Sequence, residues 1–152
     1  HMLMGVFHPD LVGIQVRALQ RLGTKQALVV YGKEGLDEIS LEGPTMIGEL
    51  KNDQIKEYEI HPSDFGLKTT KTDTFKVADA EASKKILLSV LDNQTGPALD
   101  IVCLNAGAAL YAGNLAKDIG EGLQMAKAAI ASGKAKQKLE EFIKTTQNLA
   151  KQ

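Results

Sequence analysis

A short, unbroken apolar run places the strongest constraint on the fold of this chain. Residues 27–31 read Ala-Leu-Val-Val-Tyr and are apolar at every position, whereas a half-buried strand would alternate apolar with polar residues. An unbroken run is typical of a parallel-sheet strand that is covered on both faces. The run therefore predicts an α/β fold with this strand in the interior of a sheet.

The residues just before this strand predict a helix. His8-Pro9-Asp10 suits a helix start, because proline is tolerated in the first turn and an acid is favoured near the N-terminus. A helix followed by a strand is half of a βαβ unit, so a parallel partner strand should precede residue 8, and we expect that strand to be absent from the chain. Gly23 is a plausible helix stop, and the apolar residues that recur at helical spacing are Leu11, Ile14, Ala18, Leu19 and Leu22.

After the strand, the sequence predicts an antiparallel hairpin and then a series of helices. Two runs are joined by Asn52-Asp53, a pair that favours a tight turn, and the second run alternates as a strand with one solvated face does. Asp100 is a candidate N-cap for a segment that is apolar nearly all round, which predicts a buried central helix. The predicted strands are 45–51 and 54–60, and the predicted helices are 79–91, 101–112, 117–131 and 134–151.

Charge and cysteine content narrow the classes of function. The 152 residues carry a formal net charge of −1, without the basic excess that marks nucleic-acid binding. No apolar run approaches the length of a membrane span. The single cysteine, Cys103, cannot form an internal disulfide and fits a reducing cytoplasm. We therefore expect a cytoplasmic protein that binds neither nucleic acid nor a membrane.

Two adjacent acids, Asp37 and Glu38, follow the predicted strand in a polar loop that also holds Gly32 and Gly35. Ligands of open α/β sheets bind outside the carboxyl ends of the strands. Mg²⁺ is commonly held there by one or two carboxylates together with substrate phosphates. The acid pair is therefore a candidate magnesium site, and a solvated turn is the alternative that the residues alone leave open.

Several short motifs, in order along the chain, carry a resemblance to the anthranilate phosphoribosyltransferase family. The segment around the acid pair contains Val-Val-Tyr-Gly, then Gly-Leu-Asp-Glu-Ile-Ser, then Gly-Pro-Thr. Similar segments flank it on both sides, so the resemblance runs from Gly5 to about Phe142. The motif positions are 5–11, 29–32, 35–40, 43–45, 64–67 and 100–111.

The resemblance implies a glycosyltransferase of tryptophan biosynthesis. Such an enzyme joins anthranilate to phosphoribosyl pyrophosphate (PRPP), giving N-(5-phosphoribosyl)anthranilate and pyrophosphate in the presence of Mg²⁺. An Asp-Glu pair binds a metal ion in that family, and Asp37 and Glu38 match this pair position by position. The implied fold is the C-terminal portion of a large α/β domain, with a parallel strand and an antiparallel hairpin packed with helices. Family members form homodimers through an N-terminal helical region.

Other motifs of that family are not found here. They are the Gly-Thr-Gly-Gly-Asp loop that holds pyrophosphate, the Lys-His-Gly-Asn segment and the arginine that binds anthranilate. His1-Met2 resembles the scar of a cleaved tag. We therefore expect residues 3–152 to be a C-terminal fragment that is inactive alone, associates weakly or non-physiologically, and contains no catalytic residue and no site for an organic cofactor.

Two alternatives remain open at this level. Pyrimidine nucleoside phosphorylases share the fold but bind phosphate without this use of metal, and Gly-Leu-Asp-Glu-Ile-Ser favours the transferase over them. The other alternative is a stand-alone, non-catalytic binding domain that begins near Leu3. The expected lack of a parallel partner strand before residue 8 argues against this alternative.

Overall fold

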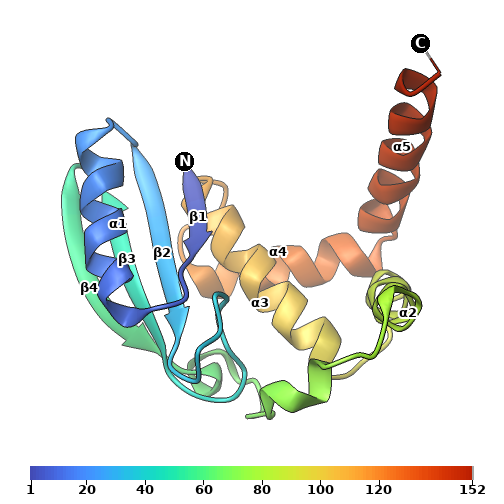
Figure 1. Cartoon of the computed structure of the whole chain (residues 1–152), viewed down its shortest axis with the longest axis horizontal. Coiled ribbons are helices and arrows are strands. Elements are labelled where there is room, and N and C mark those ends of the chain that lie inside the picture. Colours follow the sequence, from blue (N-terminus) through green and yellow to red (C-terminus); the bar gives the residue numbers. More distant parts are fainter. Residues whose placement is uncertain (152) are drawn as a thin grey trace.

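The computed structural model describes residues 1–151 as a mixed four-stranded sheet with helices packed on both of its faces (Figure 1). Two short 3-10 turns, η1 and η2, lie between the sheet and the later helices and span Pro62–Phe65 and Thr72–Phe75. The strands are β1 (Met2–Gly5), β2 (Gln26–Gly32), β3 (Thr45–Lys51) and β4 (Gln54–Ile60). The helices are α1 (Pro9–Arg21), α2 (Ala80–Leu91), α3 (Pro97–Ala112), α4 (Ile119–Ala131) and α5 (Lys134–Leu149).

The sheet has the order β1-β2-β3-β4, with β1 parallel to β2 and the other two pairings antiparallel. The expectation that the parallel partner of β2 is absent was wrong, because β1 is that strand and completes a βαβ unit with α1. The first two residues also belong to the folded body. Met2 pairs with Ala27, and the imidazole Nδ1 of His1 lies 2.8 Å from the carbonyl oxygen of Ala112. Four residues without turn signals gave too short a pattern to predict a strand.

β2 is buried on both faces, as its unbroken apolar run predicts. Ala27 and Val29 belong to the cluster beneath α1, whereas Leu28 and Val30 belong to the cluster that α3 and α4 cover on the opposite face. Successive side chains of a strand point to opposite faces, so each face needs apolar residues of its own. Figure 1 shows α1 on one side of the sheet and α3 with α4 on the other.

α1 buries only part of the stripe that its spacing predicted: Leu19 is buried and Leu11 is partly buried against the same cluster. Val12, Val16 and Leu19 are its buried residues, whereas Ile14 and Leu22 are 59% and 81% exposed. The reason lies in β3, where a Cβ atom on Gly48 would stand 3.0 Å from Val12 Cγ1 and 3.2 Å from Val16 Cγ1. The missing side chain at Gly48 thus makes room for the two valines, which turns this face of α1 toward the sheet.

α3 is the buried central helix that the sequence predicted. It begins at Pro97 with Gly96 at the N-cap position, so the assignment of Asp100 as N-cap was wrong and Asp100 lies in the first turn. α3 crosses α4 at two glycines, where a Cβ on Gly107 would stand 2.4 Å from Leu123 N and one on Gly122 2.2 Å from Gly107 O. Backbone therefore contacts backbone at this crossing, which leaves no room for a side chain between α3 and α4.

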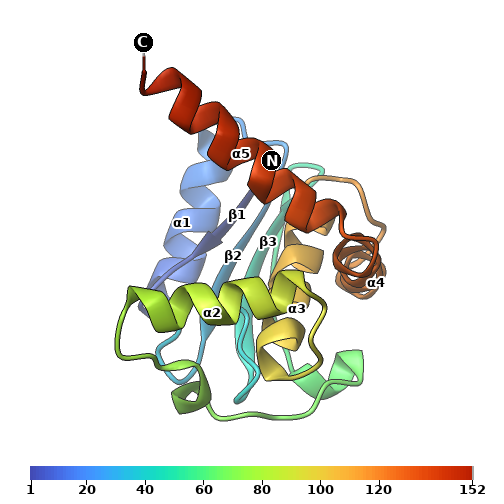
Figure 2. The ribbon, with the colours of Figure 1, turned by 90° about the vertical axis from the view of Figure 1, so that its right-hand side faces the viewer.

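The remaining segments lie at the periphery of the sheet. The hairpin turn at Asn52-Asp53 forms as predicted. η1 and η2 are single turns in the connection between β4 and α2. α5 projects away from the sheet (Figures 1 and 2), with Phe142 and Ile143 exposed. Within residues 1–151, none of the helices combines the length and the apolar character that crossing a membrane requires.

Candidate functional site

The acid pair lies in the loop that joins β2 to β3, residues 33–44, at the carboxyl end of β2. The loop starts with a tight turn in which Gly32 N donates to Leu36 O at 2.8 Å and Gly35 N donates to Gly32 O at 2.8 Å. Gly35 has a φ of +100°, a conformation that L side chains rarely adopt. The turn reverses the chain at once, so Asp37 and Glu38 come back over the end of the sheet.

Two contacts from elements distant in the sequence fix the backbone on either side of the pair. Gly5, the last residue of β1, lies directly against Asp37, since a Cβ on Gly5 would stand 1.6 Å from Asp37 O. On the other side, Ile39 N donates to Asn105 Oδ1 at 2.8 Å, and Asn105 Nδ2 donates to Ile39 O at 2.9 Å. β1 and α3 thus hold the two ends of the short segment that carries both acids.

The rest of the loop is anchored by burial and by side-chain hydrogen bonds. Ile39 and Leu41 are each 1% exposed and belong to the core beneath α3. Ser40 N donates to Thr45 Oγ1 at 3.0 Å, and both residues are fully buried. The segment after η1 adds a further tie, because Thr70 N donates to Leu41 O at 2.9 Å. The loop is therefore built into the core although it contains no regular structure.

The two carboxylates themselves face solvent and repel one another. Both Asp37 and Glu38 are exposed. Partial burial raises the pKa of the Glu38 carboxyl, and the adjacent negative charge of Asp37 raises it further. A cation placed between two such carboxylates would relieve this repulsion.

The two carboxylates of Asp37 and Glu38 suit a metal ion that takes only part of its coordination shell from protein. Among residues 1–151 no group of three or more His, Cys, Asp and Glu side chains is placed to hold a metal. Mg²⁺ usually keeps several waters and completes its shell with one or two carboxylates and substrate phosphates. Asp37 and Glu38 fit that requirement and would not form a closed structural metal site.

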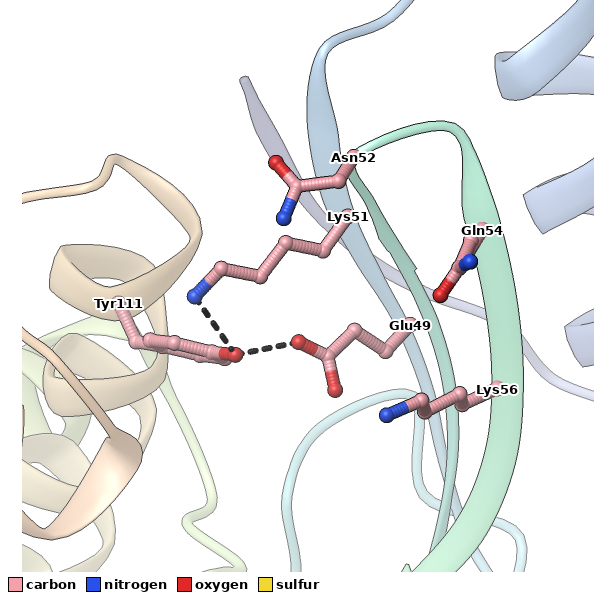
Figure 3. Close-up of a pocket in the computed structure, with 6 residues that line it drawn as sticks. All are labelled: Glu49, Lys51, Asn52, Gln54, Lys56 and Tyr111. Atoms are coloured by element: carbon pink, nitrogen blue, oxygen red, sulfur yellow. Dashed lines mark hydrogen bonds between the residues drawn. The ribbon is translucent and has the colours of Figure 1, made fainter.

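A second polar cluster, drawn in Figure 3, includes Glu49 and Lys51 of β3 and Tyr111 of α3. It lies at the opposite end of the sheet from the acid loop, because Lys51 pairs with Gln26 at the start of β2. Tyr111 of α3 donates a hydrogen bond to Glu49, and Lys51 Nζ donates to Tyr111 Oη at 3.3 Å. Burial, followed by the hydrogen bond to Glu49 and the charge on that residue, raises the pKa of Tyr111, which keeps the phenol a neutral donor. These groups satisfy one another and tie the hairpin to α3, so we interpret the cluster as structural.

Sequence reasoning placed the acid pair correctly after the buried strand, but it missed the residues that hold it. No pattern in the sequence indicated that Asn105 of α3 would bond to Ile39 in the loop. Gly5 carried no signal beyond its place in a motif. A polar amide inside an otherwise apolar helix is the feature that could have pointed to Asn105, because such a group needs a partner.

Comparison with known proteins defines the class of this chain. Residues 1–136 match the model of the glycosyl transferase family, a/b domain, and the chain therefore belongs to that family. Similar curated proteins are anthranilate phosphoribosyltransferases: the one from Polynucleobacter necessarius is 66% identical over 146 residues, and the one from Burkholderia ambifaria is 59% identical over 145. These alignments cover 96% and 95% of this chain but only 43% and 42% of those proteins, so the chain spans less than half of their length.

Solved structures agree on the fold. Anthranilate phosphoribosyltransferase from Thermus thermophilus is 33% identical with a TM-score of 0.83, over 91% of this chain and 41% of that one. The enzyme from Saccharomyces cerevisiae in complex with PRPP and Mg is 24% identical with a TM-score of 0.86, over 96% of this chain and 42% of that one, and this likeness supports the fold alone. The family resemblance is thus confirmed, and the transferase is favoured over the nucleoside phosphorylase. The role of Asp37 and Glu38 stays a prediction.

Proposed function

We propose that residues 3–152 form the C-terminal part of the α/β domain of an anthranilate phosphoribosyltransferase. The complete enzyme joins anthranilate to PRPP and releases pyrophosphate, as a step of tryptophan biosynthesis. The observation that carries this proposal is the 66% identity to a protein of that name across 96% of this chain. The loop at 33–44, with its acid pair at the carboxyl end of β2, is the part that this chain contributes to the active site.

Within that enzyme, Asp37 and Glu38 would hold Mg²⁺. The ion would neutralise negative charge as it builds on the departing pyrophosphate. The protein contributes position: the two carboxylates project from a loop that the core fixes on both sides, so they need little rearrangement when they bind. Their exposure leaves room for the waters and phosphate oxygens that complete the shell.

The same proposal includes the cellular location of the enzyme, its oligomeric state and the activity of this chain by itself. We place it in the cytoplasm, because Cys103 is a buried free thiol and the proposed substrates are small metabolites. The complete protein would form a homodimer through its helical N-terminal region. The 152-residue chain by itself would consume no anthranilate, because the pyrophosphate-binding loop is not among its residues. Turnover by this chain alone, followed as loss of anthranilate fluorescence, would contradict the proposal.

The metal role can be tested in the full-length enzyme with D37A/E38A and the isosteric D37N/E38Q. We expect kcat/KM for PRPP to fall on the order of 100-fold, because the lost interaction stabilises charge on the leaving group. A matched control is E140A/E141A, which removes two adjacent exposed acids from α5. Wild-type kinetics for both site variants across a Mg²⁺ titration would show that Asp37 and Glu38 form only a polar turn.

A further inference from the structure

The carboxamide of Asn105 makes a two-way hydrogen-bonded pair with one residue of the acid loop. Its Oδ1 accepts from Ile39 N at 2.8 Å, and its Nδ2 donates to Ile39 O at 2.9 Å. The same Nδ2 also donates to Ile101 O at 3.0 Å, one turn earlier in α3. The third bond fixes the side-chain rotamer, so the amide presents a set geometry to the loop.

Ile39 is the residue directly after Glu38, and its backbone cannot move without breaking these bonds. Its side chain is 1% exposed and packs in the core beneath α3. On the other side of the pair, the carbonyl of Asp37 rests against Gly5. The backbone that carries the two carboxylates is therefore held by β1, by α3 and by the tight turn that precedes it.

We propose that Asn105 is a positioning residue of the magnesium site. By holding both backbone groups of Ile39, it fixes the backbone from which Glu38 and Asp37 project and so limits the positions that their carboxylates can take around a cation. This inference rests on the metal role proposed above for the two acids. Asn suits the position because one carboxamide offers a donor and an acceptor side by side, which match a peptide N–H and C=O.

A purely structural Asn105 would make a different prediction. In that case its loss would lower stability, and the affinity of the folded protein for metal would be unchanged. A positioning role requires that metal affinity falls in protein that is still folded, because outer-shell partners of a metal site commonly change affinity by about 10- to 100-fold. Metal affinity therefore separates the two interpretations where melting temperature cannot.

The experiment uses the full-length enzyme and measures Mn²⁺ binding by electron paramagnetic resonance in the presence of inorganic pyrophosphate. The variants are N105A and N105D, with D37A/E38A as the reference for loss of the site. C103A is the matched control, because it truncates a buried side chain of α3 two residues away. Hydrogen exchange of the Ile39 amide and the melting temperature are measured for each variant.

We expect N105A to weaken Mn²⁺ binding about 10-fold and to speed exchange at Ile39, with C103A at wild-type affinity. N105D keeps the acceptor but loses the donor, and its added negative charge would by itself attract a cation. Weaker binding by N105D would therefore report lost geometry, and it also supports the proposal if N105A fails to fold.

Two outcomes would count against these ideas in distinguishable ways. If D37A/E38A weakens Mn²⁺ binding but N105D, together with any folded N105A, binds as tightly as C103A, the positioning role of Asn105 is overturned and the metal site stands. If D37A/E38A binds Mn²⁺ like the wild type, the metal site itself is wrong and the role of Asn105 falls with it.

Discussion

The two connections of β3 differ in how far they depend on the rest of the molecule. The β3–β4 turn consists of Asn52 and Asp53, whose φ angles of 53° and 60° give the left-handed turn that matches the twist of a hairpin. The β2–β3 loop at 33–44 is instead held by Gly5 from β1, Asn105 from α3 and Thr70 from beyond η1. The turn takes its conformation from its own residues, and Gln20 of α1 adds hydrogen bonds from Nε2 to Asp53 O at 2.8 Å and to Asp53 Oδ1 at 3.3 Å. The loop has no such conformation of its own and depends on three separate elements of the core.

Among the changes that test this difference, Gly5→Ala should cause the largest loss of stability. The new Cβ would stand 1.6 Å from Asp37 O and 2.6 Å from Asp37 C, both backbone atoms that cannot rotate away. We expect the free energy of unfolding, measured by urea denaturation, to fall by about 3 kcal/mol. Gly43→Ala in the same loop is the control, because a Cβ there meets nothing within 4 Å. Equal stabilities for the two variants would show that the loop does not rest on β1.

Thr45→Val tests the polar anchor of the loop and should have the next largest effect. Valine keeps the shape of threonine but leaves the buried Ser40 N–H without the acceptor that now lies 3.0 Å away. An unsatisfied buried donor costs on the order of 1–3 kcal/mol, so we expect a loss of about 2 kcal/mol. Thr69→Val, at an exposed position, should change little. If Thr45→Val leaves the free energy of unfolding unchanged, a water molecule must replace the hydroxyl as the acceptor for Ser40 N.

Asn52→Ala tests the β3–β4 turn. A left-handed backbone costs alanine roughly 1 kcal/mol more than asparagine or glycine, so the variant should lose about that much stability. Asn52→Gly should match or exceed the wild type, because glycine has no Cβ to strain. Neither change should affect Mn²⁺ binding in the full-length enzyme, since the turn lies at the far end of the sheet from the acids. Weaker binding by either variant would contradict the independence of the two connections.

The same contrast explains how much the sequence could predict. The hairpin at Asn52-Asp53, the interior strand β2 and the buried helix α3 were all predicted, because turn residues and apolar periodicity are local signals. The position of the acid pair after a buried strand was predictable for the same reason. Each of these features depends on residues within one element or its immediate neighbours.

What could not be predicted depends on partners distant in the chain. The bonds between Asn105 and Ile39 join residues 66 positions apart, and no spacing rule connects them. β1 was missed because four residues give no period, although its pairing with β2 is plain in the structure. The buried stripe of α1 depended on a gap at Gly48, which lies in another element. Contacts between elements that are distant in the sequence therefore determine each of these features.

The smallest expected effect concerns the charge of Glu38. It tests whether holding the two acids side by side lowers the stability of the fold. Partial burial and the charge of Asp37 raise the pKa of Glu38 above its ordinary value of 4.5. The folded state then binds this proton more tightly than the unfolded state, so its contribution to stability is complete below the ordinary pKa and is lost as pH rises through the folded pKa.

Glu38→Gln cannot ionise and should therefore be more stable than the wild type at pH 7. The gain should be no more than a few tenths of a kcal/mol, because solvent screens an exposed group, and it should disappear near pH 3.5, below the ordinary pKa. In an Asp37→Asn background the gain should shrink but persist, since burial is the larger cause of the shift and the charge of Asp37 the smaller. Paired urea denaturations at the two pH values measure this cycle. A Glu38→Gln variant that is less stable at pH 7 would mean that the carboxylate is held by favourable contacts, and the repulsion that a shared cation is proposed to relieve would be absent.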